Sequence, residues 1–222
     1  MEDKYCIHND GRFAAVFDGH GGSCVSTYLS KTLYQKINRH LKHNEKAIHD
    51  GQSVSALMRA LRVSFQEVEE EVLKQNDYQY QGSTAVAVWV HEDGDKGRTL
   101  ISANIGDSRA VMSQKGLAVE LTKDHKPDDV DEKKRIQAMG EKIEWDPYSN
   151  VYRVRNLSLS RAIGDKFAKP AVSSEVDIKT FPIKQNCGDD DFVILASDGL
   201  WDVMTSQVGS LVLCFCIHFF LL

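Results

Sequence analysis

The sequence has few of the features that mark secreted, redox-active or membrane proteins. Its five cysteines are an odd number and include no Cys-x-x-Cys pair, so neither a disulfide framework nor a zinc knuckle is indicated. The N-terminus has no apolar run behind a basic patch, and the apolar C-terminal run is shorter than the roughly 20 residues of a membrane span. We therefore expect a cytoplasmic or nuclear protein without a membrane partner.

The chain also lacks an excess of basic residues, internal repeats and low-complexity linkers. Lys and Arg number 27 against 32 Asp and Glu, for a net charge of −5. Binding of nucleic acid depends largely on basic residues that neutralise phosphates, so we expect no nucleic-acid partner. With 222 residues, 42% of them hydrophobic, the chain can bury one sizeable core, and we expect a monomer.

Apolar residues recur with helical spacing in two long segments. Val25, Leu29, Leu33, Ile37 and Leu41 predict a helix that lies on the core, with Lys31, Lys36 and Arg39 on its other side. A second helix is predicted from Ser53, as N-cap, to about Val72. A third is predicted to begin at the N-cap Asp128 and to end at Gly140.

Short β-branched runs occupy most of the remaining chain. Two of them, 83–90 and 99–105, are joined by an Asp- and Gly-rich turn and predict a hairpin. Further strands are predicted at 12–17, 109–113, 117–121 and 192–196. Strands interrupted by paired helices, without regular βαβ alternation, indicate a mostly antiparallel α+β fold.

Two of these strands end in an Asp-Gly pair, at Asp18-Gly19 and Asp198-Gly199. An Asp at a strand tip projects a carboxylate, and magnesium and manganese prefer such oxygens. A single Asp-Gly pair is more often a simple turn. With Glu2, Asp3 and Asp107 added, there are enough carboxylates for a two-metal site.

His20 stands two residues after Asp18, where an imidazole could donate a proton to a leaving group beside the metals. A lone histidine is more often a satisfied loop residue, so spacing alone permits a site without establishing one. An acidic run at 189–191 is interpreted as a solvated loop. Arg153, Arg155 and Arg161 are expected to form ion pairs.

Seven motifs in order along the chain resemble one family. They are Met1-Glu2-Asp3, Phe17-Asp18-Gly19-His20-Gly21-Gly22, Gly82-Ser83-Thr84-Ala85, Gly106-Asp107-Ser108-Arg109-Ala110, Asp124-His125-Lys126-Pro127, Leu159-Ser160-Arg161-Ala162-Ile163-Gly164-Asp165 and Ala196-Ser197-Asp198-Gly199-Leu200-Trp201-Asp202. Together they resemble the metal-dependent serine/threonine protein phosphatases of the 2C type. The resemblance implies two stacked antiparallel β-sheets flanked by pairs of α-helices, with metals in a cleft at one end.

The resemblance also implies a role for each matched residue. Asp18 would bridge two Mn²⁺ or Mg²⁺ ions, and the Gly19 carbonyl would bind one of them. Asp198 would ligate the other ion, whereas Glu2 and Asp3 would hold metal-bound waters. Asp107 would ligate a weaker third ion, and His20 would be the general acid. The implied reaction is hydrolysis of phosphoserine and phosphothreonine in phosphorylated protein substrates by a metal-activated water.

Cysteine-dependent phosphatase chemistry is the runner-up and is disfavoured by the family resemblance, although Cys6 and Arg12 have the Cys-x5-Arg spacing of those enzymes. A phosphodiesterase or nuclease is disfavoured by the family resemblance and the acidic charge. A phosphatase-like binding protein, impaired in catalysis, stays open as the alternative function.

The sequence departs from the family pattern near both ends. We expect residues 1–207 to form a partial catalytic domain and 208–222 an atypical apolar tail, interpreted as a foreign segment in preference to a core strand. The strand that carries a phosphate-binding arginine and a later Asp-Asn block have no counterpart. The fold is therefore expected to be incomplete, and the chain less active and less stable than a full-length relative.

Overall fold

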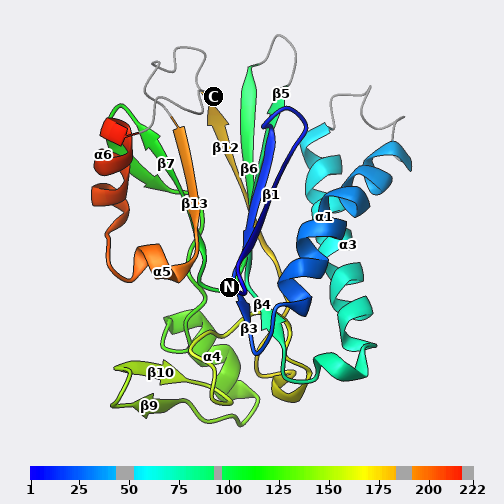
Figure 1. Cartoon of the computed structure of the whole chain (residues 1–222), viewed down its shortest axis with the longest axis vertical. Helices are drawn as coiled ribbons and strands as arrows, with labels where there is room; N and C mark the ends of the chain where they lie inside the picture. The colour runs from blue at the N-terminus through cyan, green and yellow to red at the C-terminus, as the bar shows by residue number, and fades with distance from the viewer. Residues whose placement is uncertain (44–52, 93–96, 184–191, 217–222) are drawn as a thin grey trace.

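The computed structural model describes residues 1–43, 53–92, 97–183 and 192–216 (Figure 1). The predicted acidic loop at 189–191 lies outside these ranges. Within them, no helix is long and apolar enough to cross a membrane. The two main β-sheets of the described residues pack face to face. Helices cover the outer face of each sheet, and a smaller lobe lies at one end (Figure 1).

The larger sheet is antiparallel throughout and forms the centre of the molecule. Its five strands lie in the order β1 (Lys4–His8), β2 (Phe13–Phe17), β5 (Ala85–Glu92), β6 (Arg98–Ile105) and β12 (Asp177–Ile183). The predicted hairpin is the β5–β6 pair, in which Ala85 lies opposite Ile105. Strand β2 ends at Phe17, so the predicted metal ligand Asp18 follows it directly.

The smaller sheet is also antiparallel and packs against one face of the larger one. Its order is β13 (Phe192–Ala196), β7 (Arg109–Gln114) and β8 (Leu117–Glu120). Successive side chains of a strand point to opposite faces of a sheet. Strand β5 therefore contributes side chains both to the core under the helices and to the core between the two sheets. Ala87 and Trp89 join the core under the helices, whereas Val86 and Val88 join the core between the sheets. The predicted α+β fold of stacked antiparallel sheets is confirmed.

Helices α1 (Cys24–His43) and α3 (Ser53–Leu73) cover the outer face of the larger sheet (Figure 1). The predicted apolar stripe is buried: Leu29, Leu33 and Ile37 are all 0% exposed. The expectation for Lys36 is wrong. Its side chain is buried between the two helices, where Nζ pairs with Glu71 of α3 at 2.7 Å, because a long aliphatic stem can be buried while its ammonium group finds a carboxylate.

Two further helices, α5 (Asp198–Trp201) and α6 (Ser206–Cys216), lie on the outer side of the smaller sheet. The disfavoured alternative, a core strand in the C-terminal run, is excluded as far as Cys216, because that segment is helical. The predicted domain boundary at 207/208 falls inside α6. This helix contacts β8 and β7, and its apolar side chains Leu211 and Val212 are exposed.

The lobe at the lower end in Figure 1 contains α4 (Val130–Ala138) and the hairpin of β9 (Glu144–Asp146) and β10 (Val151–Arg153). The short helix η3 (Lys166–Ala168) shares an apolar cluster with α4, whereas η1 (Asn76–Tyr78) lies against α3. The predicted N-cap is wrong by one residue, because Asp129, not Asp128, accepts from the backbone N–H groups of Asp131 and Glu132. The three arginines form the expected ion pairs: Arg153 with Asp146, Arg155 with Glu141, and Arg161 with Glu132 and Asp177.

Candidate metal centre

Four carboxylates from separate segments lie near one another at the same end of the two sheets. Asp3 precedes β1 and Asp18 follows β2, and because Lys4 lies opposite Phe17, the antiparallel pairing of these strands brings the two together. Asp107 lies in the turn between β6 and β7, and Asp198 begins α5. The pairing of Ala196 with Arg109 brings this second couple to the same end.

The proximity of these groups is expressed in the electrostatics of Asp18. Burial, the negative charges of Asp3 and Asp198, a hydrogen bond with Asp3 and the charge of Asp107 together raise the pKa of Asp18 to about 7. Like charges in a partly buried site disfavour ionisation unless a cation compensates them. The cluster is therefore one that a divalent cation would stabilise.

Asp107 already has a cationic partner. Its carboxylate is 2% exposed and contacts the ammonium group of Lys126. Burial raises the pKa of Asp107 and the lysine opposes that effect, with a net upward shift. The charges of Asp198 and Asp202 also act on Lys126. A cation at Asp107 would thus have to displace or share this lysine.

The donor set at the site fits a hard divalent cation, because it consists of carboxylate oxygens and backbone carbonyls. Gly19 is required for close packing: a Cβ there would lie 2.7 Å from Ser26 Oγ and 2.8 Å from the Glu2 carbonyl oxygen. The Ser26 hydroxyl donates to that same carbonyl at 2.5 Å. Within the described ranges, however, no three His, Cys, Asp or Glu side chains are gathered at metal-binding spacing.

His20 lies beside the carboxylates and makes its own buried ion pair. Its Nε2 is 2.6 Å from Oδ2 of Asp165, and the side chains are 27% and 0% exposed. Burial lowers the pKa of His20, but the hydrogen bond and charge of Asp165, with the charges of Asp18 and Asp107, outweigh it, so the pKa is raised. The predicted general acid is therefore held by a carboxylate that is not one of the predicted ligands.

A three-stranded miniature sheet produces this pair. Its order is β11 (Ile163–Gly164), β4 (Gly82–Ser83) and β3 (Gly19–His20), so Gly82 lies opposite both His20 and Gly164. A Cβ on Gly82 would come within 2.5 Å of His20 Nε2 and closer still to Asp165 Oδ2. The absence of a side chain at this position is what lets the two groups meet.

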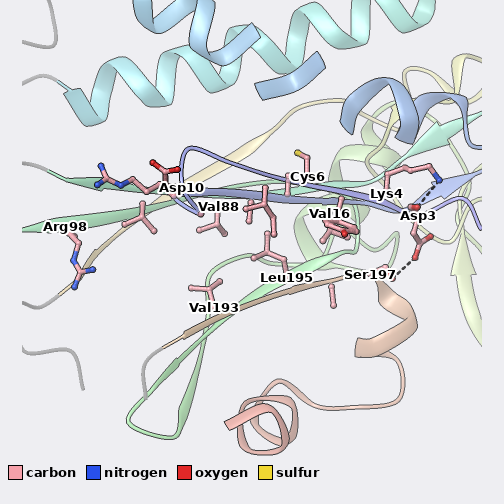
Figure 2. Close-up of a pocket in the computed structure, with 18 of the residues that line it drawn as sticks. Asp3, Lys4, Cys6, Asp10, Val16, Val88, Arg98, Val193, Leu195 and Ser197 are labelled. Atoms are coloured by element: carbon pink, nitrogen blue, oxygen red, sulfur yellow. Dashed lines mark hydrogen bonds between the residues drawn. The ribbon is translucent and has the colours of Figure 1, made fainter. Parts of the chain in front are cut away.

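A cavity of about 850 Å³ extends from the site along the interface between the sheets. Figure 2 shows Val16 and Val88 on one side of it and Val193 and Leu195 on the other. Asp3 lies at its end near the metal centre, where it accepts a hydrogen bond from Ser197 Oγ at 3.3 Å. The cavity is thus lined mostly by apolar side chains, and of the four carboxylates of the site only Asp3 lines it.

Several residues of this site have no role that could be predicted from the sequence alone. Asp165 and Lys126 lie in recognised motifs, but only the three-dimensional structure pairs them with His20 and Asp107. Asp202, four residues after Asp198, also acts on Lys126 through its charge. A signal existed for Asp202, since an i, i+4 spacing places two carboxylates on one helical face.

The sequence profile of the protein phosphatase 2C family matches residues 6–211. The chain is 36% identical over 225 aligned positions to probable protein phosphatase 2C 75 of Arabidopsis thaliana, with 93% of this chain and 51% of the relative covered. It is 38% identical to probable protein phosphatase 2C 45 of Oryza sativa subsp. japonica, with 93% and 69% covered. The chain belongs to the protein phosphatase 2C family.

Solved structures agree with this assignment. A sex-determining protein of C. elegans superposes with a TM-score of 0.81 at 27% identity, over 98% of this chain and 53% of that one. A serine-threonine phosphatase 2C from Toxoplasma gondii superposes with a TM-score of 0.71 at 25% identity, over 93% and 76%. The chain spans about half the length of the first curated relatives it matches.

Proposed function

We propose that this chain carries the catalytic centre of a metal-dependent hydrolase that removes phosphate from phosphoserine and phosphothreonine in proteins. One observation supports the proposal above all others: Asp3, Asp18, Asp107 and Asp198 converge from four segments beside His20. Family membership supports the same reaction class.

The proposed ligands are those that the family motifs indicate. Two Mn²⁺ or Mg²⁺ ions would be held by Asp18. The Gly19 carbonyl would bind one of the ions, and Asp198 would bind the other. Glu2 and Asp3 would hold water molecules in the ion shells. Asp107 would bind a weaker third ion only in exchange for its contact with Lys126.

Bound ions would supply a water of lowered pKa and would stabilise negative charge on the phosphoryl oxygens. The chain's own residues would orient the reactants and manage the proton. His20 would donate a proton to the serine or threonine oxygen that leaves the phosphorus atom. The charges of Asp18 and Asp107 favour the protonated imidazole, which is the form that can donate.

Release of inorganic phosphate from a phosphothreonine peptide tests the proposal. The purified chain is stripped with EDTA and supplied with Mn²⁺ or Mg²⁺. We expect hydrolysis to return with the metal, and Asp18→Ala and Asp198→Ala to lower it at least about 100-fold, because even residues that only support metal ligands matter 10- to 100-fold. A nucleotide and a phosphodiester serve as competing substrates.

Asp131→Ala is the matched control, since Asp131 is a 79% exposed carboxylate on α4, away from the cluster. It should retain full activity. Metal-independent hydrolysis, or full activity in Asp18→Ala, would contradict the proposal. Binding of the phosphopeptide without turnover would instead support the alternative of a phosphatase-like binding protein.

A further inference from the structure

We infer that Asp165 is a positioning residue for His20: it holds Nε2 of the imidazole so that Nδ1 is the nitrogen that delivers the proton. This inference rests on the proposed function, because it assigns a role within the same site. It concerns a residue outside the set of ligands and acids that the sequence motifs suggested.

The two ring nitrogens of His20 differ in their hydrogen-bond partners. Nε2 is 2.6 Å from Asp165 Oδ2, and Nδ1 has no hydrogen-bond partner among the described residues. A carboxylate can only accept, so the shared proton stays on Nε2 in the neutral ring. The proton that His20 can give away is therefore the one on Nδ1 of the imidazolium.

The backbone around Asp165 is fixed from several sides. Its N–H donates to the Gln81 carbonyl at 2.9 Å, and its own carbonyl accepts from the N–H of Ala168 at 2.8 Å. The preceding Gly164 N–H donates to the buried carboxylate of Glu69 on α3 at 2.8 Å. A group held in this way can fix the direction of another, which a mobile carboxylate could not do.

The arrangement is unfavourable for folding in two respects. Asp165 is fully buried, and its Oδ1 has no hydrogen-bond partner among the described residues. Its φ of +50° lies in the left-handed region. A buried carboxylate oxygen without a partner is costly, and such costs concentrate at functional sites. A purely structural ion pair would not require this combination.

The proton balance of the inferred step is simple. The oxygen of water forms a new bond to phosphorus, and the electron pair of the breaking P–O bond goes to the serine or threonine oxygen. That oxygen takes the proton from Nδ1 of His20. One proton of the water stays on the phosphate product and the other passes to solvent, from which the imidazole is reprotonated. In between, the imidazole is neutral, with its Nε2 proton still shared with Asp165.

The variant Asp165→Asn tests the inference with little change in shape, because Asn tolerates the left-handed conformation. Two substrates separate positioning from folding. A phosphothreonine peptide needs a proton on its leaving oxygen, whereas p-nitrophenyl phosphate releases a stable phenolate. We expect kcat for the peptide to fall about 10- to 100-fold, within the range of general acid catalysis, and kcat for p-nitrophenyl phosphate to fall less than about 3-fold.

Two further variants sharpen the result. His20→Ala should show the same selectivity, and the double variant should be no slower than His20→Ala alone, because both changes remove one function. Asp131→Asn serves as the matched control and should leave both substrates unaffected. An equal loss on both substrates, or additive losses in the double variant, would overturn the inference.

An NMR measurement on the metal-free chain keeps the inference separate from the proposed function. A downfield imidazole N–H resonance that exchanges slowly with water, and is absent from His20→Ala, should move upfield in Asp165→Asn. This result is expected even if the wild-type chain hydrolyses neither substrate, in which case only the proposed function fails. A resonance unchanged in Asp165→Asn would overturn the inference in either case.

Discussion

The two outer layers of the sandwich are held in different ways. On the larger sheet, α1 and α3 bury an apolar stripe in which Leu29, Leu33 and Phe65 are at most 1% exposed. On the smaller sheet, α6 turns Ser206, Gly209 and Ser210 inward and exposes Val208, Leu211 and Val212. The first layer is therefore stabilised chiefly by burial of apolar area.

The second layer combines a small apolar cluster, in which Trp201 of α5 packs against Val111 and Ile194, with polar contacts. The Arg109 guanidinium pairs with both carboxylate oxygens of Asp124 and donates to Ser206 Oγ at 3.0 Å. Gln207 bonds to the backbone of Gly116 and Ala118 at the β7–β8 turn. The comparison teaches that helices on the two sides of one sandwich are held by different proportions of apolar and polar contact, and that Asp198 lies on the side with the smaller apolar cluster.

The largest effect on stability is expected in the first layer. Leu29→Ala removes a fully buried side chain from α1 and should lower the free energy of unfolding by about 2–5 kcal/mol. Urea denaturation followed by circular dichroism measures this loss. A loss below 1 kcal/mol would mean that this layer is not held by apolar burial.

Arg109→Met tests the polar character of the second layer. The change breaks the pair with Asp124 and the bond to Ser206, at a cost of about 2 kcal/mol. Hydrogen exchange should rise in β7, β13 and α6 and stay unchanged in α1 and α3. Arg155→Met, which loses an exposed ion pair with Glu141, is the control and should leave hydrogen exchange in both layers unchanged. An equal rise of hydrogen exchange in both layers would show that Arg109 does not stabilise the second layer selectively.

A smaller effect on stability is expected from a hydrogen bond that connects the two sheets. The buried His125, which follows β8, donates from Nε2 to Asp177 at the start of β12, at 3.2 Å. That bond, with the charges of His125 and Arg161, lowers the pKa of Asp177 to about 2, against about 3.9 in an unfolded chain. Because the folded value is the lower one, the stabilisation is complete above about pH 5 and is lost as the pH falls toward 2.

The expected contribution of this hydrogen bond is under about 1 kcal/mol, because Asp177 is 44% exposed. Unfolding free energies of the wild type and Asp177→Asn, measured by urea from pH 7 to pH 2, should differ at neutral pH and converge in acid. A constant difference over that range would show that the effect is not ionic.

The smallest effect is expected for Leu211→Ala on α6, the counterpart of Leu29→Ala. Leu211 is 44% exposed, so the change should alter the unfolding free energy by less than about 0.5 kcal/mol. The same urea titration applies. A loss comparable with that of Leu29→Ala would show that α6 buries this side chain in solution.

Local patterns in the sequence were sufficient to predict much of the fold. The four-residue spacing from Val25 to Ile37 predicted α1, and the apolar run before Asp18 predicted β2. Both depend on neighbours within a few residues. The burial of Lys36 could not be predicted in this way, because its partner Glu71 lies 35 residues away on another helix.

The site was predicted in the same uneven manner. Asp18 and Asp198 stand at visible strand ends, so the sequence could suggest both as ligands and their position at one end of the sheets. The partner of His20 is 145 residues away, and the contact depends on a miniature sheet of two-residue strands. Strands this short have no detectable periodicity, so neither Asp165 nor the contact of Lys126 with Asp107 could be inferred from local spacing.

The contact between His20 and Asp165 depends on the absence of a side chain at Gly82. One methyl group at this position would occupy the space in which His20 Nε2 and Asp165 Oδ2 meet. Gly82→Ala would thus act as a steric wedge that separates the pair while the chain keeps every carboxylate of the metal centre. Under the proposed function, this variant would still bind substrate but hydrolyse it slowly, so it offers a route to a substrate trap with which the protein's targets could be captured.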